Sequence, residues 1–150
     1  MTTDDRLKQL GMELPAAIKP IAAFVMAART GDLLFVSGHI ARKDGRPWTG
    51  QLGRNMTTAD GKTAAHAVAL DLLATLQDSL GSLDKVKRIV KALCLVNSTG
   101  DFTEQHLVAN GCSELLVSVF GERGAHARSA FGVAQLPMGA CVEVELVVEV

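Results

Sequence analysis

The 150-residue chain contains no tyrosine, and aromatic residues make up only 4% of it. Aliphatic side chains must therefore form most of the core, and 150 residues are enough to build one as a single domain. Neither sign of charge is in excess, since 15 Lys/Arg stand against 16 Asp/Glu. Nucleic-acid-binding proteins usually carry a basic excess, so the composition disfavours that class. The near-neutral charge also leaves little repulsion between copies, which permits an oligomer.

Long apolar runs are missing as well. No stretch reaches the roughly 20 uninterrupted apolar residues that a membrane span needs. The first residues, MTTDDRLKQLGMELP, are charged and lack the apolar segment of a secretory signal. The three cysteines, Cys94, Cys112 and Cys141, are scattered and have no CxxC spacing. We therefore expect buried, reduced thiols in a cytoplasmic protein.

Sequence signatures of metal sites and nucleophiles are also absent. The four histidines are far apart and form no HExxH motif, so we expect no metal site. No GxSxG nucleophile motif occurs. The glycine-rich stretch 45–53 matches neither the phosphate-binding loop nor the dinucleotide-binding fingerprint.

The first half of the chain predicts a hairpin, a loop and a helix. Two apolar runs, 22–28 and 32–38, flank the turn sequence RTG and predict a β-hairpin. Residues 39–56 are rich in glycine and predict a long loop of the kind that often serves function. Trp48 in this loop either lines a cleft or packs on the surface. Thr57 then caps a helix whose apolar residues recur at helical spacing up to Gly81.

The second half predicts a strand, a helix and two further strands. Residues 86–97 are apolar and β-branched, and DFTE (101–104) repeats the capping signal before a helix that ends at Gly121. Strands follow at 128–134 and 140–150, and the last alternates valine or leucine with mainly glutamate.

The predicted order is β-β-α-β-α-β-β, an α+β two-layer sandwich with both helices on one side of the sheet. Residues 1–14 are expected to be an N-terminal lead-in, and 15–150 a single domain. The other face of the sheet carries both carboxylates and apolar residues, and packing between subunits would explain such a mixed face.

Arg128 is the one charged residue in the apolar segment HARSAFGVAQLP (126–137). Burying a guanidinium without an anionic partner costs free energy, so we expect an anion to meet Arg128. If the last two strands are antiparallel neighbours joined by QLPMG, Arg128 lies within reach of Glu143, Glu145 and Glu149. Two alternatives follow. Either Arg128 pairs with one of these glutamates, or it binds a carboxylate of a ligand through its planar fork while a glutamate holds a water.

Several segments resemble the YjgF/Rid family, whose founding activity is the deamination of reactive enamine and imine intermediates. The most specific is ARSAFGVAQLPMGACVEVELV, supported by LPAAIKP, GDLLFVSGHIA and the helix with its following strand, AAHAVALDLLATLQDSLGSLDKVKRIVKALCLVN. The resemblance covers roughly residues 15–150. It implies a chorismate-mutase-like fold, a homotrimer built around a barrel-like core of sheets, and ligand clefts between subunits.

The resemblance also implies roles for individual residues. Arg128, in ARS, matches the arginine that grips the substrate carboxylate, and Glu143, in VEVE, matches the glutamate that places the attacking water. Ser37, in VSG, matches a serine of the same cleft. The implied reaction hydrolyses 2-aminoacrylate or a related 2-imino acid to the 2-keto acid and ammonia, with no metal or organic cofactor.

The sequence departs from the family pattern around this cleft. Ile21 stands where the deaminases usually carry a tyrosine, and Phe24 can fill that space without donating a hydrogen bond. His39 replaces the common glutamine after SG, and Ala130 replaces a frequent cysteine. The NDF before the second helix is replaced by the longer NSTGDF.

Three functions are therefore weighed. The first is an enamine/imine deaminase that uses Arg128 and Glu143, with Ser37, Phe24 and His39 lining the site. The second is a trimer that binds a small carboxylate such as a 2-keto acid without turnover, which the missing tyrosine and Ala130 favour. The third, an endoribonuclease, is disfavoured by the near-neutral charge and the scarce aromatic residues. No membrane partner is expected.

Overall fold

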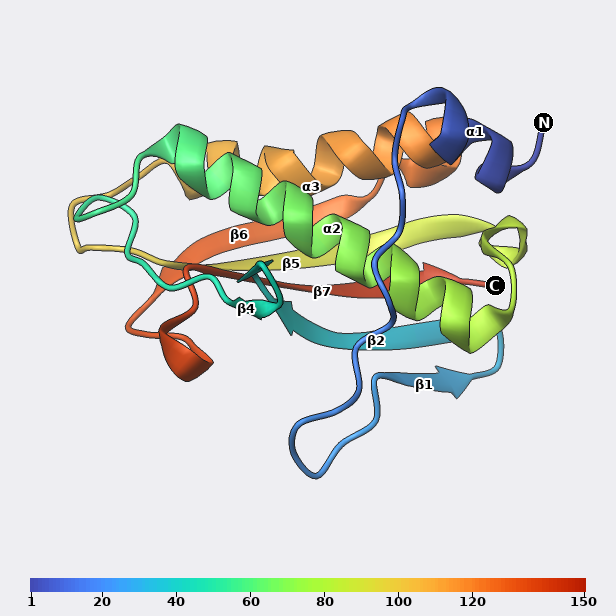
Figure 1. The fold of residues 1–150 in the computed structure, drawn as a ribbon, viewed down its shortest axis with the longest axis horizontal. Helices are drawn as coiled ribbons and strands as arrows, with labels where there is room; N and C mark the ends of the chain where they lie inside the picture. The colour runs from blue at the N-terminus through green and yellow to red at the C-terminus, as the bar shows by residue number, and fades with distance from the viewer.

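The computed structural model describes residues 1–150 and has the predicted layers (Figure 1). In chain order its elements are α1 (Thr3–Gln9), β1 (Ala27–Thr30), β2 (Leu33–Ile40), β3 (Arg42–Lys43), β4 (Arg46–Pro47), α2 (Thr58–Leu80), the 3₁₀ turn η1 (Leu83–Lys85), β5 (Arg88–Asn97), α3 (Gln105–Phe120), η2 (Gly121–Gly124), β6 (Ala127–Val133), η3 (Pro137–Gly139) and β7 (Val142–Glu149).

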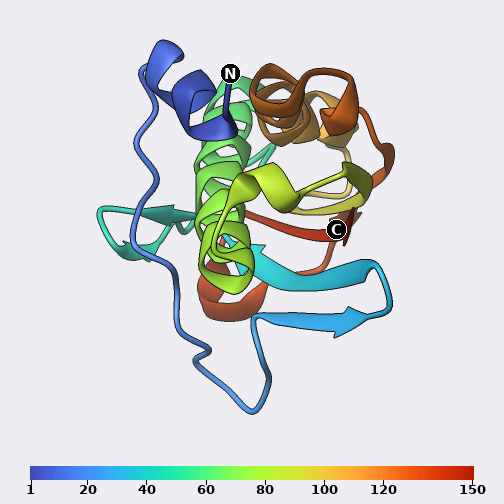
Figure 2. The ribbon, with the colours of Figure 1, turned by 90° about the vertical axis from the view of Figure 1, so that its right-hand side faces the viewer.

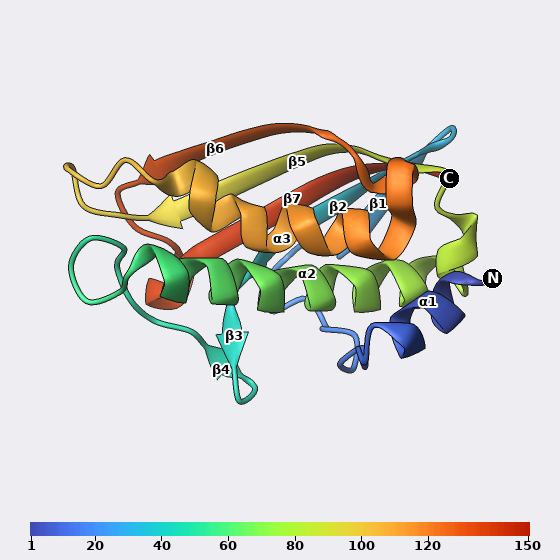
Figure 3. The same cartoon turned by 90° about the horizontal axis from the view of Figure 1, so that it is seen from above.

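Five strands form one mixed sheet in the order β1-β2-β7-β5-β6. β7 pairs antiparallel with β2 and β5, whereas β6 pairs parallel with β5. Helices α2 and α3 lie side by side across one face of the sheet (Figures 2 and 3). The expected α+β sandwich is therefore confirmed, with both long helices on one side.

The two long helices begin and pack as their sequences require. Thr57 and Asp60 form a reciprocal capping box at the start of α2, and Gly81 ends the helix in a left-handed conformation. Gly111 of α3 faces the backbone of α2, where any side chain would collide with the carbonyl of Lys62. This glycine therefore lets the helices approach closely. The capping signal predicted at 101–104 is wrong, because α3 starts at Gln105 without a side-chain cap.

β7 is the central strand because one of its faces is continuously apolar. Its even-numbered residues from Val142 to Val148 are almost fully buried under the helices. The prediction that the last two strands are neighbours is wrong. β5, α3 and β6 form a β-α-β unit, in which a helix crossover places the second strand parallel to the first. β6 is consequently an edge strand, and β5 separates it from β7.

Two local predictions need correction. The predicted hairpin is shorter than expected: it turns at Gly31–Asp32, and β1 begins only at Ala27. Residues 22–26 belong to a loop. The predicted loop 39–56 also contains regular structure, since β2 extends to Ile40 and β3 pairs with β4 in a small ribbon. Asp44 and Gly45 both have positive φ at the tip of that ribbon. Asp-Gly is the pair that favours such two-residue hairpins.

The N-terminal segment is folded onto the body of the protein. α1 buries Leu7 in the hydrophobic core, and Thr3 donates hydrogen bonds to Asp84 from both its amide and its hydroxyl. All three cysteines are buried and free. Burial raises the pKa of the Cys94 thiol to about 12 and that of Cys141 to about 11, which keeps both thiols protonated. None of the helices has the length and apolar character that crossing a membrane requires.

Candidate functional site

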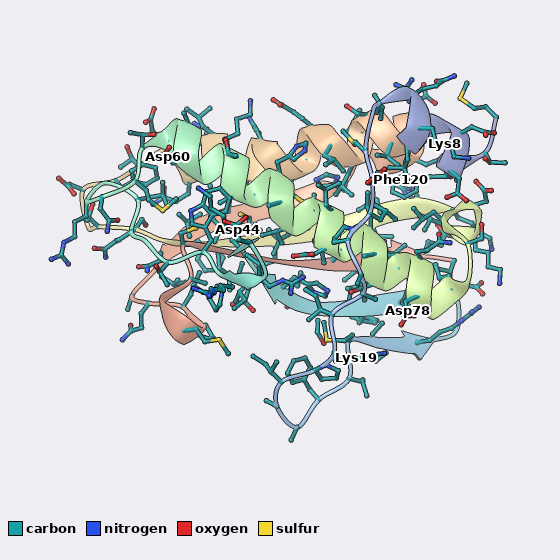
Figure 4. The ribbon with its side chains drawn as sticks, in the orientation of Figure 1. Lys8, Lys19, Asp44, Asp60, Asp78 and Phe120 are labelled. Atoms are coloured by element: carbon teal, nitrogen blue, oxygen red, sulfur yellow. The ribbon has the colours of Figure 1, made fainter.

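A cavity of about 380 Å³ lies beside β2 and β7, on the side of the sheet that the helices leave uncovered. We call this side the open face. The loop before β1, the end of β2, the β3–β4 ribbon and η3 enclose the cavity. Figure 4 labels Lys19 on the chain segment that leads into this wall and Asp44 on the ribbon. The cavity is lined by Ile18, Lys19, Ile21, Ala22, Phe24, Met26, Gly38, His39, Ile40, Arg42, Gly45, Pro47, Pro137, Met138 and Glu143.

Glu143 is the carboxylate in this cavity. It lies opposite Ile40 in the β2–β7 ladder, and its side chain passes directly over Gly38. A Cβ at Gly38 would collide with the carboxylate, so only glycine leaves room for it there. Burial and, second, the charge of Glu145 raise the pKa of Glu143. A carboxylate with a raised pKa is a stronger proton acceptor than an ordinary glutamate.

Ser37 organises the wall of the cavity. Its hydroxyl donates to the carbonyl of Val25 at 2.6 Å, and its amide donates to the carbonyl of Met26 at 2.8 Å. These two bonds fasten the end of the loop that carries Phe24 to β2. Phe24 and Ile21, the residue at the position of the family tyrosine, both line the cavity. Of the predicted residues, Phe24 and Glu143 line the cavity, whereas Ser37 fastens its wall with a hydroxyl that is bonded to Val25.

His39 points the other way. A register irregularity in β2 after Val36 turns its ring toward the helices, where the residue is 2% exposed. Nδ1 lies 2.6 Å from the carbonyl of Ser37 and must donate to it, so Nε2 accepts from the hydroxyl of Thr75 at 2.7 Å. Burial lowers the pKa of His39. Both ring nitrogens are engaged within the chain, and only the strand at this position borders the cavity.

Arg128 lies on β6, away from Glu143. It pairs with Ala92 of β5, whose side chain is buried beneath the helices, so Arg128 also faces the helix side. The expectation that Arg128 lies within reach of the glutamates of the last strand is therefore wrong for a single chain. β5 intervenes, and Glu143 and Glu145 face the opposite side of the sheet.

The guanidinium of Arg128 meets no carboxylate at all. Nη1 donates to Oδ1 of Asn110 at 2.9 Å and to Oγ of Ser113 at 3.1 Å, and Nη2 donates to the carbonyl of His106 at 3.1 Å. The ion pairs of the chain are Arg42–Asp71 and Lys62–Glu114. Of the two alternatives for Arg128, the internal pair with a glutamate is excluded.

The open face itself is an apolar surface interrupted by charge. Phe35 and Phe131 are each 47% exposed on it. Side chains of the central strands share this face by their register: Leu93, Leu95, Glu143, Glu145 and Val147. Large exposed apolar patches of this kind mark interaction sites.

Trp48 and the missed residues complete the comparison with the sequence predictions. Trp48 does not border the cavity that contains Glu143; it lies under the ammonium of Lys43, 4.9 Å from the ring centroid. Sequence reasoning missed Gly38, Asn110 and Ser113. The sequence carried no signal that singled out Asn110 and Ser113, because their contact with Arg128 depends on where β6 pairs in the sheet.

Comparison with known proteins agrees with the fold and with the sequence resemblance. Residues 4–150 match the family model described as "YjgF/chorismate_mutase-like, putative endoribonuclease". Protein TCP17 of Trypanosoma cruzi is 51% identical over 145 residues, which cover 95% of this chain and 91% of that protein. The crystal structure of Atu1372 from Agrobacterium tumefaciens, a protein of unknown function, is 40% identical, covers 99% of this chain and 93% of that one, and has a TM-score of 0.90.

A third relative extends the match to the full length of both chains. The crystal structure described as a "putative endoribonuclease" from Shewanella oneidensis MR-1 has a TM-score of 0.95 and 28% identity, and covers 100% of each chain. Together with the fold and the match over residues 4–150, these similarities show that the chain belongs to the YjgF/Rid family.

Proposed function

We propose that the protein is a 2-imino acid deaminase, which hydrolyses 2-aminoacrylate or a related enamine or imine to the 2-keto acid and ammonia. The observation that carries the proposal is the guanidinium of Arg128, which is held by neutral groups only and has no carboxylate partner in the chain. A half-buried arginine of this kind is available for an anion from outside.

The site would be completed by a second copy of the chain. Arg128 and Glu143 lie on opposite faces of one sheet, separated by β5. An assembly that packs the open face of one copy near the β6 edge of the next would bring Arg128 of one copy to the Glu143 cavity of the other. The exposed Phe35 and Phe131 support such packing. We infer a homotrimer, in keeping with the family resemblance.

The chemistry then follows from the two groups. Arg128 would hold the substrate carboxylate in a bidentate pair, which fixes the imine carbon over the cavity. Glu143 would take a proton from water as the water oxygen bonds to that carbon and the C=N π bond breaks, and would pass this proton to nitrogen to give a carbinolamine. It would then take the second proton from the new hydroxyl and pass it to nitrogen as the C=O bond forms and the C–N bond breaks. The imino acid and one water give the 2-keto acid and ammonia. Burial assists by raising the pKa of Glu143 toward the working range.

A carboxylate-binding protein without turnover is the second candidate. Ile21 at the position of the family tyrosine and the engaged ring of His39 leave the cavity with fewer hydrogen-bonding groups than a deaminase of the family has. Such a trimer would bind a 2-keto acid through Arg128 and release it unchanged.

Turnover of imino acids generated in situ by an amino-acid oxidase separates these candidates. A deaminase accelerates release of the keto acid over buffer, and Arg128→Ala lowers kcat/KM by about 10²-fold or more, since a hydrogen-bonded charge is removed from the substrate. Absence of any acceleration across several amino acids, with 2-keto acid binding retained, would establish the binding protein instead.

A further inference from the structure

Helix α3 presents a stripe of acceptors to Arg128. The carbonyl of His106 and the side chains of Asn110 and Ser113 lie at helical spacing on one face of α3, and together they accept three hydrogen bonds from Nη1 and Nη2. All three acceptors are uncharged. They therefore fix the orientation of the guanidinium without neutralising its charge.

A directed chain of hydrogen bonds supports Ser113 in turn. A guanidinium can only donate, so the hydroxyl of Ser113, which accepts from Arg128, gives its own hydrogen to Nε2 of His126 at 2.9 Å. Nδ1 of His126 donates to the carbonyl of Gly124 at 2.6 Å. Gly124 packs so closely on α3 that a Cβ would collide with the carbonyl of Leu116, which holds this turn in place.

The remaining donors of Arg128 have no acceptor in the chain. A guanidinium has five N–H groups, and three are used by Asn110, Ser113 and His106. Nε and one N–H of Nη2 are left. This pair matches the two oxygens of a carboxylate, which bind a guanidinium through parallel bonds.

We propose that Asn110 and Ser113 are positioning residues: they hold the guanidinium of Arg128 so that Nε and Nη2 face an incoming carboxylate, and His126 fixes Ser113 in that role. This inference rests on the proposed function, because it names the residues that prepare the carboxylate grip of the same site. In this proposal α3 contributes to substrate binding without touching the substrate, because its side chains act only by orienting Arg128.

Asn110→Asp gives the sharpest test because it changes charge and almost nothing else. The new carboxylate would lie where Oδ1 now accepts from Arg128, and would pair with it inside the protein. We expect the melting temperature to rise while the affinity of the whole protein for 2-oxobutanoate, measured by calorimetry, falls by about 10-fold or more. Asn55→Asp is the matched control, since Asn55 is exposed and its Oδ1 accepts from a backbone amide of its own loop.

Ser113 gives an independent readout. Ser113→Ala removes one acceptor and the link to His126, and we expect KM for an imino acid to rise about 3- to 10-fold with kcat nearly unchanged. Ser113→Thr keeps the hydroxyl and should restore KM. Equal KM values in all three proteins would overturn the role of Ser113.

The remaining outcomes separate this inference from the proposed function. If Asn110→Asp binds 2-oxobutanoate as tightly as the wild type, or no more weakly than Asn55→Asp, the positioning role is refuted while Arg128 can still serve the reaction. A wild type that binds 2-oxobutanoate but shows no deaminase turnover removes the proposed reaction and leaves the positioning role intact. A wild type that binds no 2-oxobutanoate, or an Arg128→Ala variant that binds it normally, removes the carboxylate grip and both proposals.

Discussion

The helix-covered face and the open face of the sheet treat their polar groups differently. Under the helices, the buried ring of His39 is hydrogen-bonded through both nitrogens, to the carbonyl of Ser37 and to the hydroxyl of Thr75. On the open face, Glu143 has a raised pKa and no hydrogen-bond partner in the chain, and it lies among exposed apolar side chains. Away from the β6 edge, the helix side is therefore satisfied within one copy of the chain, whereas the open face has the character of a surface that another molecule covers.

Arg128 shows the same contrast at the edge of the sheet. It faces the helix side, and α3 satisfies three of its donors, yet its charge is left without an anion. The difference between the two faces therefore indicates which residues serve function. Groups that the chain satisfies fully are structural, and groups that it leaves partly satisfied, Arg128 and Glu143, are those we assign to the substrate.

The largest difference in the free energy of unfolding is expected between substitutions at two neighbouring residues of β7 that face opposite sides of the sheet. Leu146 is 1% exposed under the helices, so Leu146→Ala should cost about 2–5 kcal/mol in the free energy of unfolding. Val147 is on the open face, and Val147→Ala should cost about 1 kcal/mol or less. Urea denaturation at one fixed protein concentration measures both. Equal losses would show that the open face is as well packed as the core.

Charge placed on the open face should act on assembly. Phe35→Glu is expected to leave the far-ultraviolet circular dichroism unchanged, because the side chain is exposed in one copy, and to convert the proposed homotrimer to monomers in light scattering. Asp32→Glu, a conservative change in the nearby turn, serves as the control. An oligomer that withstands Phe35→Glu would place the contact between copies elsewhere.

Buried His39 should make the fold acid-sensitive. Burial lowers its pKa, so below the ordinary value of about 6.5 the unfolded chain takes up a proton that the folded one does not. Stability is therefore lost as pH falls through the ordinary range of histidine. His39→Gln should be less stable at pH 7 but should lose less on acidification. Parallel pH profiles of the two proteins would contradict this assignment.

Glu143 should show the opposite sign. Its pKa is raised, so the folded chain binds the proton more tightly, and stability falls as pH rises from the ordinary glutamate range through the raised value. Glu143→Gln should therefore raise Tm at pH 7 and leave it nearly unchanged at pH 4. Scanning calorimetry at both pH values tests it. A variant less stable than the wild type at pH 7 would mean that the carboxylate has a structural role.

The sequence was most informative where a pattern depends on neighbours along the chain. The strict alternation in 140–150 predicted the two faces of β7, and Thr57 with Gly81 predicted both ends of α2. The Asp44–Gly45 signal for the ribbon was present in the sequence but was absorbed into a predicted loop.

What the sequence did not determine is which strands are neighbours. A short link such as QLPMG is compatible with a hairpin, but pairing of β6 with β5 through α3 competes with that hairpin, and only the packed sheet decides between them. Arg128 could therefore be recognised as a residue in need of a partner, but its partners on α3 could not be derived. The same limit applies to His39, whose direction depends on an irregularity in β2.

The most direct test of a site shared between copies is to mix two inactive variants. Arg128→Ala keeps Glu143, and Glu143→Ala keeps Arg128, so a mixed oligomer contains some sites with both groups. After co-refolding at equal amounts, random assembly predicts recovery of about a quarter of wild-type deaminase activity. If the mixture remains as inactive as its two components while the wild type treated in the same way recovers activity, Arg128 and Glu143 of neighbouring copies do not form one site.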